Sequence, residues 1–297
     1  MPVRRPRGPS PEQVRRRRLA ALGGLLVAFL ALVVAVWIAL PHVHRRAAAP
    51  PPPPPPPKPF RVIFPEGFTR QQMAQRVGAV RKIAKRKRHK QVALSSRAYL
   101  LATRRAVVPC FGRQPRTNLE GFLFPATYDF LQTTTSRELA RHQLDAFCAN
   151  WRKVSLGYAR TKQLTPYDVL IIASMVEKET LAPDERKLVA AVIYNRLHAR
   201  MPLGIDATLR YGLKIPPTES IRQSQLDSDS PYNTRKRTGL PPTPIGAPGL
   251  ASIQAAAHPA QVDYLYFVRK PDRVHHFFTA SESEFLRYEC SHGYGCG

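Results

Sequence analysis

The first long apolar stretch of the chain covers residues 19–40 and reads LAALGGLLVAFLALVVAVWIAL. Its 22 residues contain no charged side chain, which is enough for an α-helix to cross the hydrocarbon core of a bilayer. A cleaved signal peptide is the alternative, because AAA at 47–49 resembles a cleavage site. The apolar core of a signal peptide spans only about 7–15 residues, however. We therefore predict a retained transmembrane helix at 19–40.

Beyond residue 59 the apolar pattern changes to that of a strand followed by a helix. Residues 60–64 read FRVIF, in which large apolar side chains recur at every second position, the period of a half-buried β-strand. Pro-Glu-Gly at 65–67 marks a turn. Thr69, with Gln72 three residues later, has the spacing of a capping box. A strand, a turn and a helix are therefore expected in that order.

Two further helices are predicted, at 164–180 and 184–200. The first has a strong start signal, because Thr165 can act as the cap, Pro166 takes the first helical position and Asp168 follows three residues after the cap. Its apolar positions continue up to residue 176. Such a helix is expected to lie in the core.

The remaining segments are shorter. Residues 119–130, LEGFLFPATYDF, predict a turn that feeds a short strand. Residues 201–250 are rich in Gly and Pro, and loops of that length are uncommon unless they carry a function. Two strands are predicted within 262–270 and 274–280, and a short last helix after Ser281. The mixture indicates an α+β fold behind a single N-terminal transmembrane helix.

The charge balance is strongly basic. The chain contains 46 Lys and Arg against 20 Asp and Glu, a net charge of +26, which predicts an anionic neighbour. A GC-rich coding bias would give the same Arg, Ala and Pro enrichment. Residues 81–90, RKIAKRKRHK, hold seven of these basic residues. This run is interpreted either as a solvated face or as a docking surface for anionic polymer or lipid.

The charges that flank the apolar stretch predict its orientation. Four arginines at 15–18 precede it directly, whereas only Arg45 and Arg46 follow it closely. The positive-inside rule then makes 1–18 a cytoplasmic tail and places the chain after residue 40 outside the plasma membrane. The segment 41–59 is predicted to be a linker, and the eight prolines in a row at 50–57 within it are expected to form a stiff rod about 25 Å long. Nucleic acid is excluded as a partner by this topology.

The four cysteines have no metal-binding spacing. They are Cys110, Cys148, Cys290 and Cys296. The last two flank His292, but three ligands leave a zinc site one short. We therefore expect no metal and no cofactor, and either disulfides or free thiols in an oxidising compartment.

Two glutamates end the helix at 164–180. Glu177 and Glu179 are two residues apart, which separates them by roughly 200° around a helix, so they cannot face the same cleft. Ile172, Met175 and Val176 share the face of Glu179, and apolar surroundings raise the pKa of a carboxyl toward that of a general acid. Glu177 has Ser174 one turn back, which suits a structural carboxylate. The alternative is that both end a core helix in solvent.

Five blocks in order resemble a known family. They are IIASMVEKET, DERKLVAAVIYNRL, MPLGIDATLRYGL, SPYNTRKRTGLPPTPIGAPG and HPAQVDYLYFV. Together they resemble the endolytic murein transglycosylase family, and the resemblance extends over roughly residues 60–280. The resemblance implies a small LysM-like α/β subdomain at 60–115, a mixed α+β catalytic domain at 116–285, and a C-terminal tail at 286–297 without a family counterpart.

The resemblance also implies an activity. Members of the family are anchored enzymes that cleave nascent peptidoglycan between N-acetylmuramic acid and N-acetylglucosamine and leave a 1,6-anhydro end. The C6 hydroxyl of the sugar attacks, so one carboxylic acid suffices where hydrolases use two. The implied partners are glycan strands, the plasma membrane and cell-wall synthases. A catalytically inactive wall-binding scaffold and a muramidase-type hydrolase are the alternatives.

The resemblance assigns roles to individual residues. The catalytic acid is expected at Glu179, since its Glu-Thr step resembles the Glu-Ser step of other lytic transglycosylases, and Glu177 is the rival. The expected substrate-binding residues are Asp206, Asn195, Tyr211, Tyr232 and Asn233. His275 or His276 matches a family histidine, which we interpret as a strand residue with its hydrogen bonds satisfied within the fold. Pro202 and Gly204-Ile205 depart from the family pattern.

Overall fold

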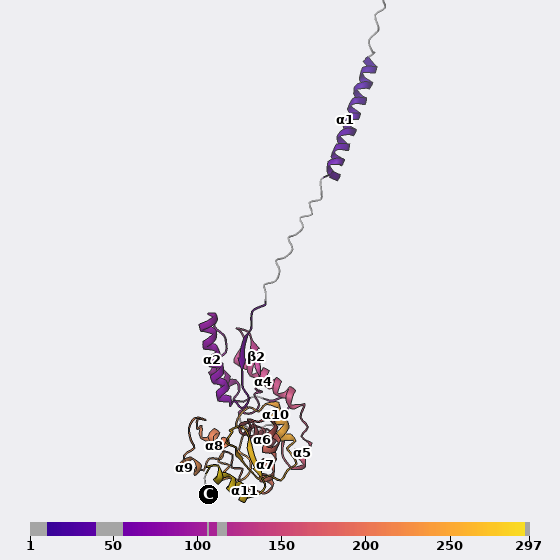
Figure 1. The fold of residues 1–297 in the computed structure, drawn as a ribbon. Coiled ribbons are helices and arrows are strands. Elements are labelled where there is room, and N and C mark those ends of the chain that lie inside the picture. The colour runs from indigo at the N-terminus through magenta and orange to yellow at the C-terminus, as the bar shows by residue number, and fades with distance from the viewer. Residues whose placement is uncertain (1–10, 40–55, 106, 112–117, 295–297) are drawn as a thin grey trace, which may run out of the picture. The chain divides into compact units, whose positions relative to one another are not determined.

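The computed structural model describes residues 11–39, 56–105, 107–111 and 118–294. Residues 1–56 and 57–297 form two separate units. In the first unit, helix α1 (Pro11–Ala39) includes an apolar stretch of 25 residues, Val14–Ile38 (Figure 1). The mean hydropathy of this stretch is 2.8, and none of it is buried. By length and composition this helix can cross a membrane, and an N-terminal signal sequence would meet the same criteria. Most of the proline run lies outside the described residues.

The second unit is mostly helical, and its only sheets within the described residues have two strands each (Figure 1). The α+β prediction is therefore right about the presence of strands but overstates their share. The strands are β1 (Phe60–Ile63), β2 (Thr127–Phe130), β3 (Tyr266–Arg269) and β4 (His276–Thr279). The helices are α2 (Arg70–Arg88), α3 (Ser96–Ala102), α4 (Ser136–Trp151), α5 (Gly157–Thr161), α6 (Pro166–Glu179), the 3-10 turn η1 (Pro183–Glu185), α7 (Arg186–His198), α8 (Asp206–Leu213), α9 (Gln223–Leu226), α10 (Leu250–Ala257) and α11 (Glu282–Ser291).

The sheet at the start of the unit pairs segments that are far apart in the sequence. Strand β1 lies antiparallel to β2, with Phe60 opposite Phe130. Phe60 and Val62 are buried and the residues between them are exposed, as the alternating pattern predicts. Because this pairing joins residues before and after position 115, the segments proposed as a LysM-like subdomain and a catalytic domain share a sheet. The division at 115/116 stays a prediction.

Three helices begin at threonine capping boxes. In each, the threonine hydroxyl accepts the N–H of the third residue of the helix, whose side chain accepts the threonine N–H. The caps are Thr69 before α2, Thr135 before α4 and Thr165 before α6. Those at Thr69 and Thr165 confirm the predicted helix starts, and each such cap contributes about 1 kcal/mol.

Helix α6 runs through the middle of the core. Every residue from Val169 to Val176 is buried, because α7 and α10 both pack against it. Helix α7 is also buried all round between Val189 and Tyr194. Because α6 is surrounded by close-packed neighbours, its position is fixed, and the glutamates at its C-terminal end are carried on a rigid element.

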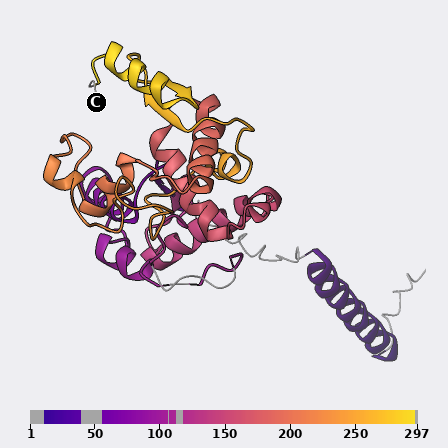
Figure 2. The ribbon, with the colours of Figure 1, turned by 90° about the horizontal axis from the view of Figure 1, so that it is seen from below.

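The C-terminal part contains the predicted hairpin. Strands β3 and β4 are antiparallel, with Phe267 opposite Phe278, and α11 packs beside them (Figure 2). Ser281 caps α11 by accepting the N–H of Glu284. The prediction of two strands followed by a short helix is confirmed.

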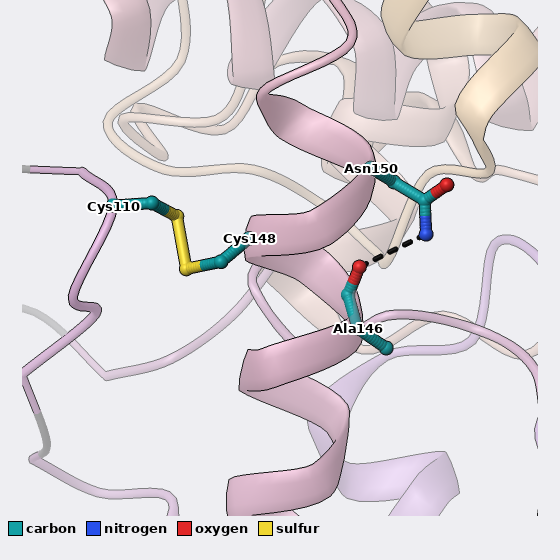
Figure 3. The surroundings of a disulfide bond; sticks show 4 residues. All are labelled: Cys110, Ala146, Cys148 and Asn150. Carbon is teal, nitrogen blue, oxygen red and sulfur yellow. Dashed lines mark hydrogen bonds between the residues drawn. A yellow bond between two sulfur atoms is a disulfide. The ribbon is translucent and has the colours of Figure 1, made fainter.

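A disulfide joins Cys110 to Cys148 of α4 (Figure 3). The two Cα atoms are 5.4 Å apart, within the normal range for a disulfide. The loop that contains Cys110 is thereby tied to the helix. Cys296 lies outside the described residues.

Candidate functional site

Glu179 is the last residue of α6 and lies at the edge of the buried core. The helix is fully buried from Val169 to Val176, whereas its last three residues, Glu177 to Glu179, are half-buried. Thr180, the residue after it, is held within the helix end, because both its N–H and its hydroxyl donate to the carbonyl of Val176, at 3.0 and 2.7 Å. The helix therefore ends in a defined conformation directly behind the carboxyl.

The carboxyl of Glu179 lies at the start of α8. The backbone N–H of Ala207 and the carboxylate of Asp206, the first residue of α8, are both close enough to act on its charge. Burial, and then Asp206, raise the pKa of Glu179 to about 7. Arg269, the Ala207 N–H and Arg235 act in the opposite direction. A carboxyl with a pKa near neutrality can both give and take a proton.

Asp206 is in turn fixed by an arginine. Its Oδ1 lies 2.7 Å from Nε of Arg235, and both side chains are about half exposed. Two threonines bring these segments together: the hydroxyls of Thr208 and Thr234 are 2.9 Å apart, and the N–H of Ile205 donates to Thr234 at 3.1 Å. The Gly- and Pro-rich stretch at 201–250 is thus an ordered segment, which contains α8 and α9 and positions charge next to Glu179.

Glu177 is placed differently. Its Oε2 accepts the N–H of Gly249, the cap residue of α10, at 2.9 Å. The carboxyl of Glu66 lies against the same glycine, and burial together with the charge of Glu177 raises the pKa of Glu66. Ser174 does not contact Glu177, since its hydroxyl donates to Ile171 and accepts from Ile245. Glu177 thus joins α6 to α10.

Two of the predicted substrate residues share one network. The hydroxyl of Tyr211 donates to Glu120 at 3.1 Å, and that of Tyr232 pairs with Thr243 at 2.8 Å. The two rings meet edge to face, with centroids 5.2 Å apart. Tyr211 belongs to α8, so the network reaches the helix that carries Asp206.

The two asparagines bind the backbone. Asn195 donates from its side-chain nitrogen to the carbonyls of Val262 and Tyr264, each at 2.9 Å. Asn233 is fully buried, and its amide holds a loop through Leu226, Ser228 and Arg235. A sugar-binding role for either residue stays a prediction.

Glu120 is a third carboxyl with a raised pKa. It is buried, with 5% of its surface exposed, and it accepts the backbone N–H of Arg70 at 2.9 Å in addition to the hydroxyl of Tyr211. Burial raises its pKa to about 7 against these hydrogen bonds and the charges of Arg70 and Lys178. Burial also lowers the pKa of Lys178. The sequence at 119–130 predicted only a turn that feeds a short strand, because Arg70 and Tyr211 reach Glu120 from segments 50 and 91 residues away.

The two histidines of the hairpin are both paired. His276 is buried, and its Nδ1 lies 2.7 Å from Glu185, whose other oxygen accepts the His276 N–H at 2.9 Å. His275 is exposed and pairs with Asp272. This agrees with the interpretation of a satisfied strand histidine.

Two concave sites on the surface of the described residues do not include Glu179 in their lining. One, of about 550 Å³, is lined by Asn195 together with Tyr158, Tyr264 and the loop at 259–264. The other, of about 610 Å³, is lined mainly by arginines. Among the described residues, no three His, Cys, Asp or Glu side chains gather as a metal-ligand set.

Two charged neighbours of Glu179 were not predicted. Arg235 stands in a loop rich in basic residues, and Arg269 is the exposed last residue of β3. Neither has a local signal, because each approaches Glu179 only through the packing of distant segments. The proximity of Asp206 to Glu179 was expected only through the family resemblance.

Comparisons with known proteins place the chain in a family. The YceG-like family matches residues 50–289. The endolytic murein transglycosylase of Streptococcus pneumoniae is 36% identical over 69% of this chain and 39% of that protein, and that of Bacillus subtilis is 36% identical over 54% and 44%. The aligned part thus spans about two fifths of these relatives. A YceG-like protein of Listeria monocytogenes has a similar structure, with a TM-score of 0.65, 28% identity and coverage of 77% and 75%. The chain belongs to the YceG-like family.

Proposed function

We propose that this chain is a membrane-anchored endolytic peptidoglycan transglycosylase with Glu179 as its catalytic acid and base. The observation that carries the proposal is the half-buried Glu179 carboxyl on a rigid helix end, with a pKa of about 7 and a second carboxylate, Asp206, beside it. The two relatives named endolytic murein transglycosylases support the substrate class.

The proposed reaction needs one proton-transfer group. Protonated Glu179 gives its proton to the oxygen between N-acetylmuramic acid and N-acetylglucosamine, and the bond from C1 to that oxygen breaks. The C6 hydroxyl of the same muramic acid then bonds to C1 and loses its proton to the Glu179 carboxylate. No water enters, the 1,6-anhydro end forms, and Glu179 is restored. The attacking hydroxyl is already held by the substrate, which favours this route.

Asp206 is proposed to assist as a fixed negative charge. A carboxylate beside the scission site stabilises positive charge that develops at C1 and disfavours early loss of the Glu179 proton. Its ion pair with Arg235 keeps it in place. Tyr211 contacts both Glu120 and the ring of Tyr232. These two tyrosines are proposed to shape the adjoining surface for sugar rings.

Helix α1 is proposed to be the membrane anchor. Arginines precede its apolar part, so the N-terminus lies in the cytoplasm and residues 57–297 lie outside, where peptidoglycan is made. The proposed partners are glycan strands, the plasma membrane and nearby cell-wall synthases. The disulfide between Cys110 and Cys148 fits an oxidising compartment.

A muramidase-type hydrolase is the second candidate. Hydrolases use two carboxyls at the scissile bond, and Asp206 lies near Glu179. The contact between Arg235 and Asp206 Oδ1 argues against this role, because the carboxylate would have to leave the arginine to bond to C1 or to take a proton from water.

Analysis of the digestion products distinguishes the candidates. Purified full-length protein is incubated with uncrosslinked glycan strands, and the new ends are identified by mass spectrometry. Anhydro ends, 18 Da lighter than reducing ends because one water is missing, are expected. Reducing ends would establish the hydrolase, and no new ends would favour a wall-binding scaffold.

A further inference from the structure

Four arginines meet at one concave surface away from Glu179. Arg70 begins α2, Arg97 lies in α3, and Arg104 and Arg105 follow the end of α3. Together with Leu100, Leu101 and Asn118 they line a cavity of about 610 Å³. We call it the arginine cavity. It is separate from the basic run at 81–90, which belongs to the other end of α2.

The charges in the arginine cavity are not neutralised by nearby acids. Among the ion pairs of the described residues, none involves Arg97, Arg104 or Arg105, and no carboxylate lines the cavity. The buried Glu120 acts on Arg70 and accepts its backbone N–H. Like charges that line one cavity repel each other, so an anion that contacts several of them would stabilise the surface.

Arg70 is held in position before any ligand arrives. Its Nη1 donates to the carbonyl of Leu100 at 3.0 Å and to the hydroxyl of Thr103 at 3.2 Å. These bonds use one nitrogen and leave the rest of the planar guanidinium for other acceptors. A fixed arginine costs less conformational entropy on binding than a mobile one.

The number of guanidinium groups favours phosphate over carboxylate. One carboxylate has two oxygens and one charge, which a single arginine fork satisfies. Four arginines match the larger charge and the additional acceptor oxygens of a phosphate or pyrophosphate group. Leu101, 62% exposed beside them, adds an apolar contact suited to a phosphate that carries a hydrocarbon chain.

We propose that the arginine cavity is a binding site for phosphate-bearing ligands. This site is distinct from the proposed catalytic centre, and its existence does not depend on the reaction at Glu179. The phosphate can come from a membrane phospholipid or from a ligand free of the bilayer, and the chemistry of recognition is the same in both cases.

Calorimetric titration of the full chain in neutral detergent with inorganic pyrophosphate tests the proposal. We compare wild type with the triple variant Arg97→Gln, Arg104→Gln and Arg105→Gln. The matched control also removes three positive charges, but from the exposed face of α2: Arg81→Gln, Lys82→Gln and Arg86→Gln. The cavity variant is expected to bind at least about tenfold more weakly, because charge-assisted hydrogen bonds are lost, and the control less than about threefold.

Equal losses in both variants would mean that only overall charge matters and would overturn the proposal, as would absence of pyrophosphate binding to wild type. If the triple variant does not fold, by its thermal unfolding, Arg105→Gln alone is compared with Arg81→Gln by the same criteria.

The source of the phosphate is identified with nanodiscs. Wild type is placed in discs of phosphatidylcholine with or without phosphatidylglycerol, and pyrophosphate is titrated. The site is assigned to a lipid headgroup if wild type binds pyrophosphate more weakly in the anionic discs than in the neutral discs, and the cavity variant shows no such difference. Unchanged binding would assign it to a phosphate ligand outside the bilayer.

Discussion

Glu177 and Glu179 leave the same last turn of α6, yet each contacts the start of a different helix. Glu177 accepts the N–H of Gly249 before α10, whereas Glu179 lies close to Asp206 and the N–H of Ala207 at the start of α8. The two sites differ in what else is present. Asp206 and burial raise the pKa of Glu179 to about 7, whereas Glu177 completes a hydrogen bond between two core helices. The comparison shows that neighbours brought by the fold separate two carboxyls that the local sequence makes nearly equivalent.

The largest expected effect is on catalysis. Glu179→Gln keeps the size of the side chain but removes the transferable proton, so strand cleavage should fall by about 10²–10⁴-fold. Glu177→Gln is the control and should keep most of the activity. The rate is measured by the release of anhydro-ended fragments. Full activity in Glu179→Gln, or loss only in Glu177→Gln, would reverse the assignment.

The second effect concerns stability at Glu177. Glu177→Ala leaves the buried Gly249 N–H without its acceptor, which should lower the free energy of unfolding by about 1–3 kcal/mol. Glu177→Gln keeps an acceptor oxygen and should cost less. Urea or thermal unfolding monitored by circular dichroism measures both. If Gln destabilises as much as Ala, charge rather than the hydrogen bond stabilises this end of α6.

Glu120 tests whether a raised pKa is sufficient for catalysis. Its pKa in the folded protein is about 7 against an ordinary 4.5, so the folded state binds more protons and loses stability as pH rises from about 4.5 to 7. Glu120→Gln removes this loss and should stabilise the protein at pH 8 by on the order of 1–2 kcal/mol.

The products formed by Glu120→Gln should still be anhydro-ended, since Glu120 is not among the groups that act on the Glu179 carboxyl. Unfolding at pH 5 and pH 8 provides the comparison. A variant with the same pH dependence of stability as wild type would contradict the raised pKa.

The smallest effect is a shift of the pH profile. Glu179 must be protonated to act as the acid, so activity should decline as pH rises through about 7. Asp206→Asn removes a negative charge that raises this pKa and leaves Arg235 unpaired beside it, so both changes lower the pKa. The basic limb should move to lower pH by up to about one unit.

The pH dependence of kcat/KM over pH 5–9 measures this shift. Asp272→Asn, at an exposed acid in the turn of the hairpin that is not among the charges acting on Glu179, is the matched control and should not move the limb. A basic limb that stays in place in Asp206→Asn would remove Asp206 from the account of the Glu179 proton.

The local parts of the fold could be predicted from the sequence. Thr165, Pro166 and Asp168 gave the start of α6, and the alternation around Phe60 gave β1, because capping and period are set within a few residues. Helix α8 was missed inside a Gly- and Pro-rich stretch. Its start is held by Thr234, 26 residues beyond Thr208, and no local pattern reports such a contact.

The sequence by itself determined the apolar helix α1, the capped helix α6 and the opposite faces of Glu177 and Glu179 on it. These follow from composition and from the geometry of one helix. Only the tertiary structure decided that α8 and Arg235 come to Glu179, that Gly249 comes to Glu177, and that Cys110 pairs with Cys148. The physical reason is that burial and electrostatic neighbours depend on segments tens of residues apart, whose meeting is fixed by packing of the whole core rather than by any local period.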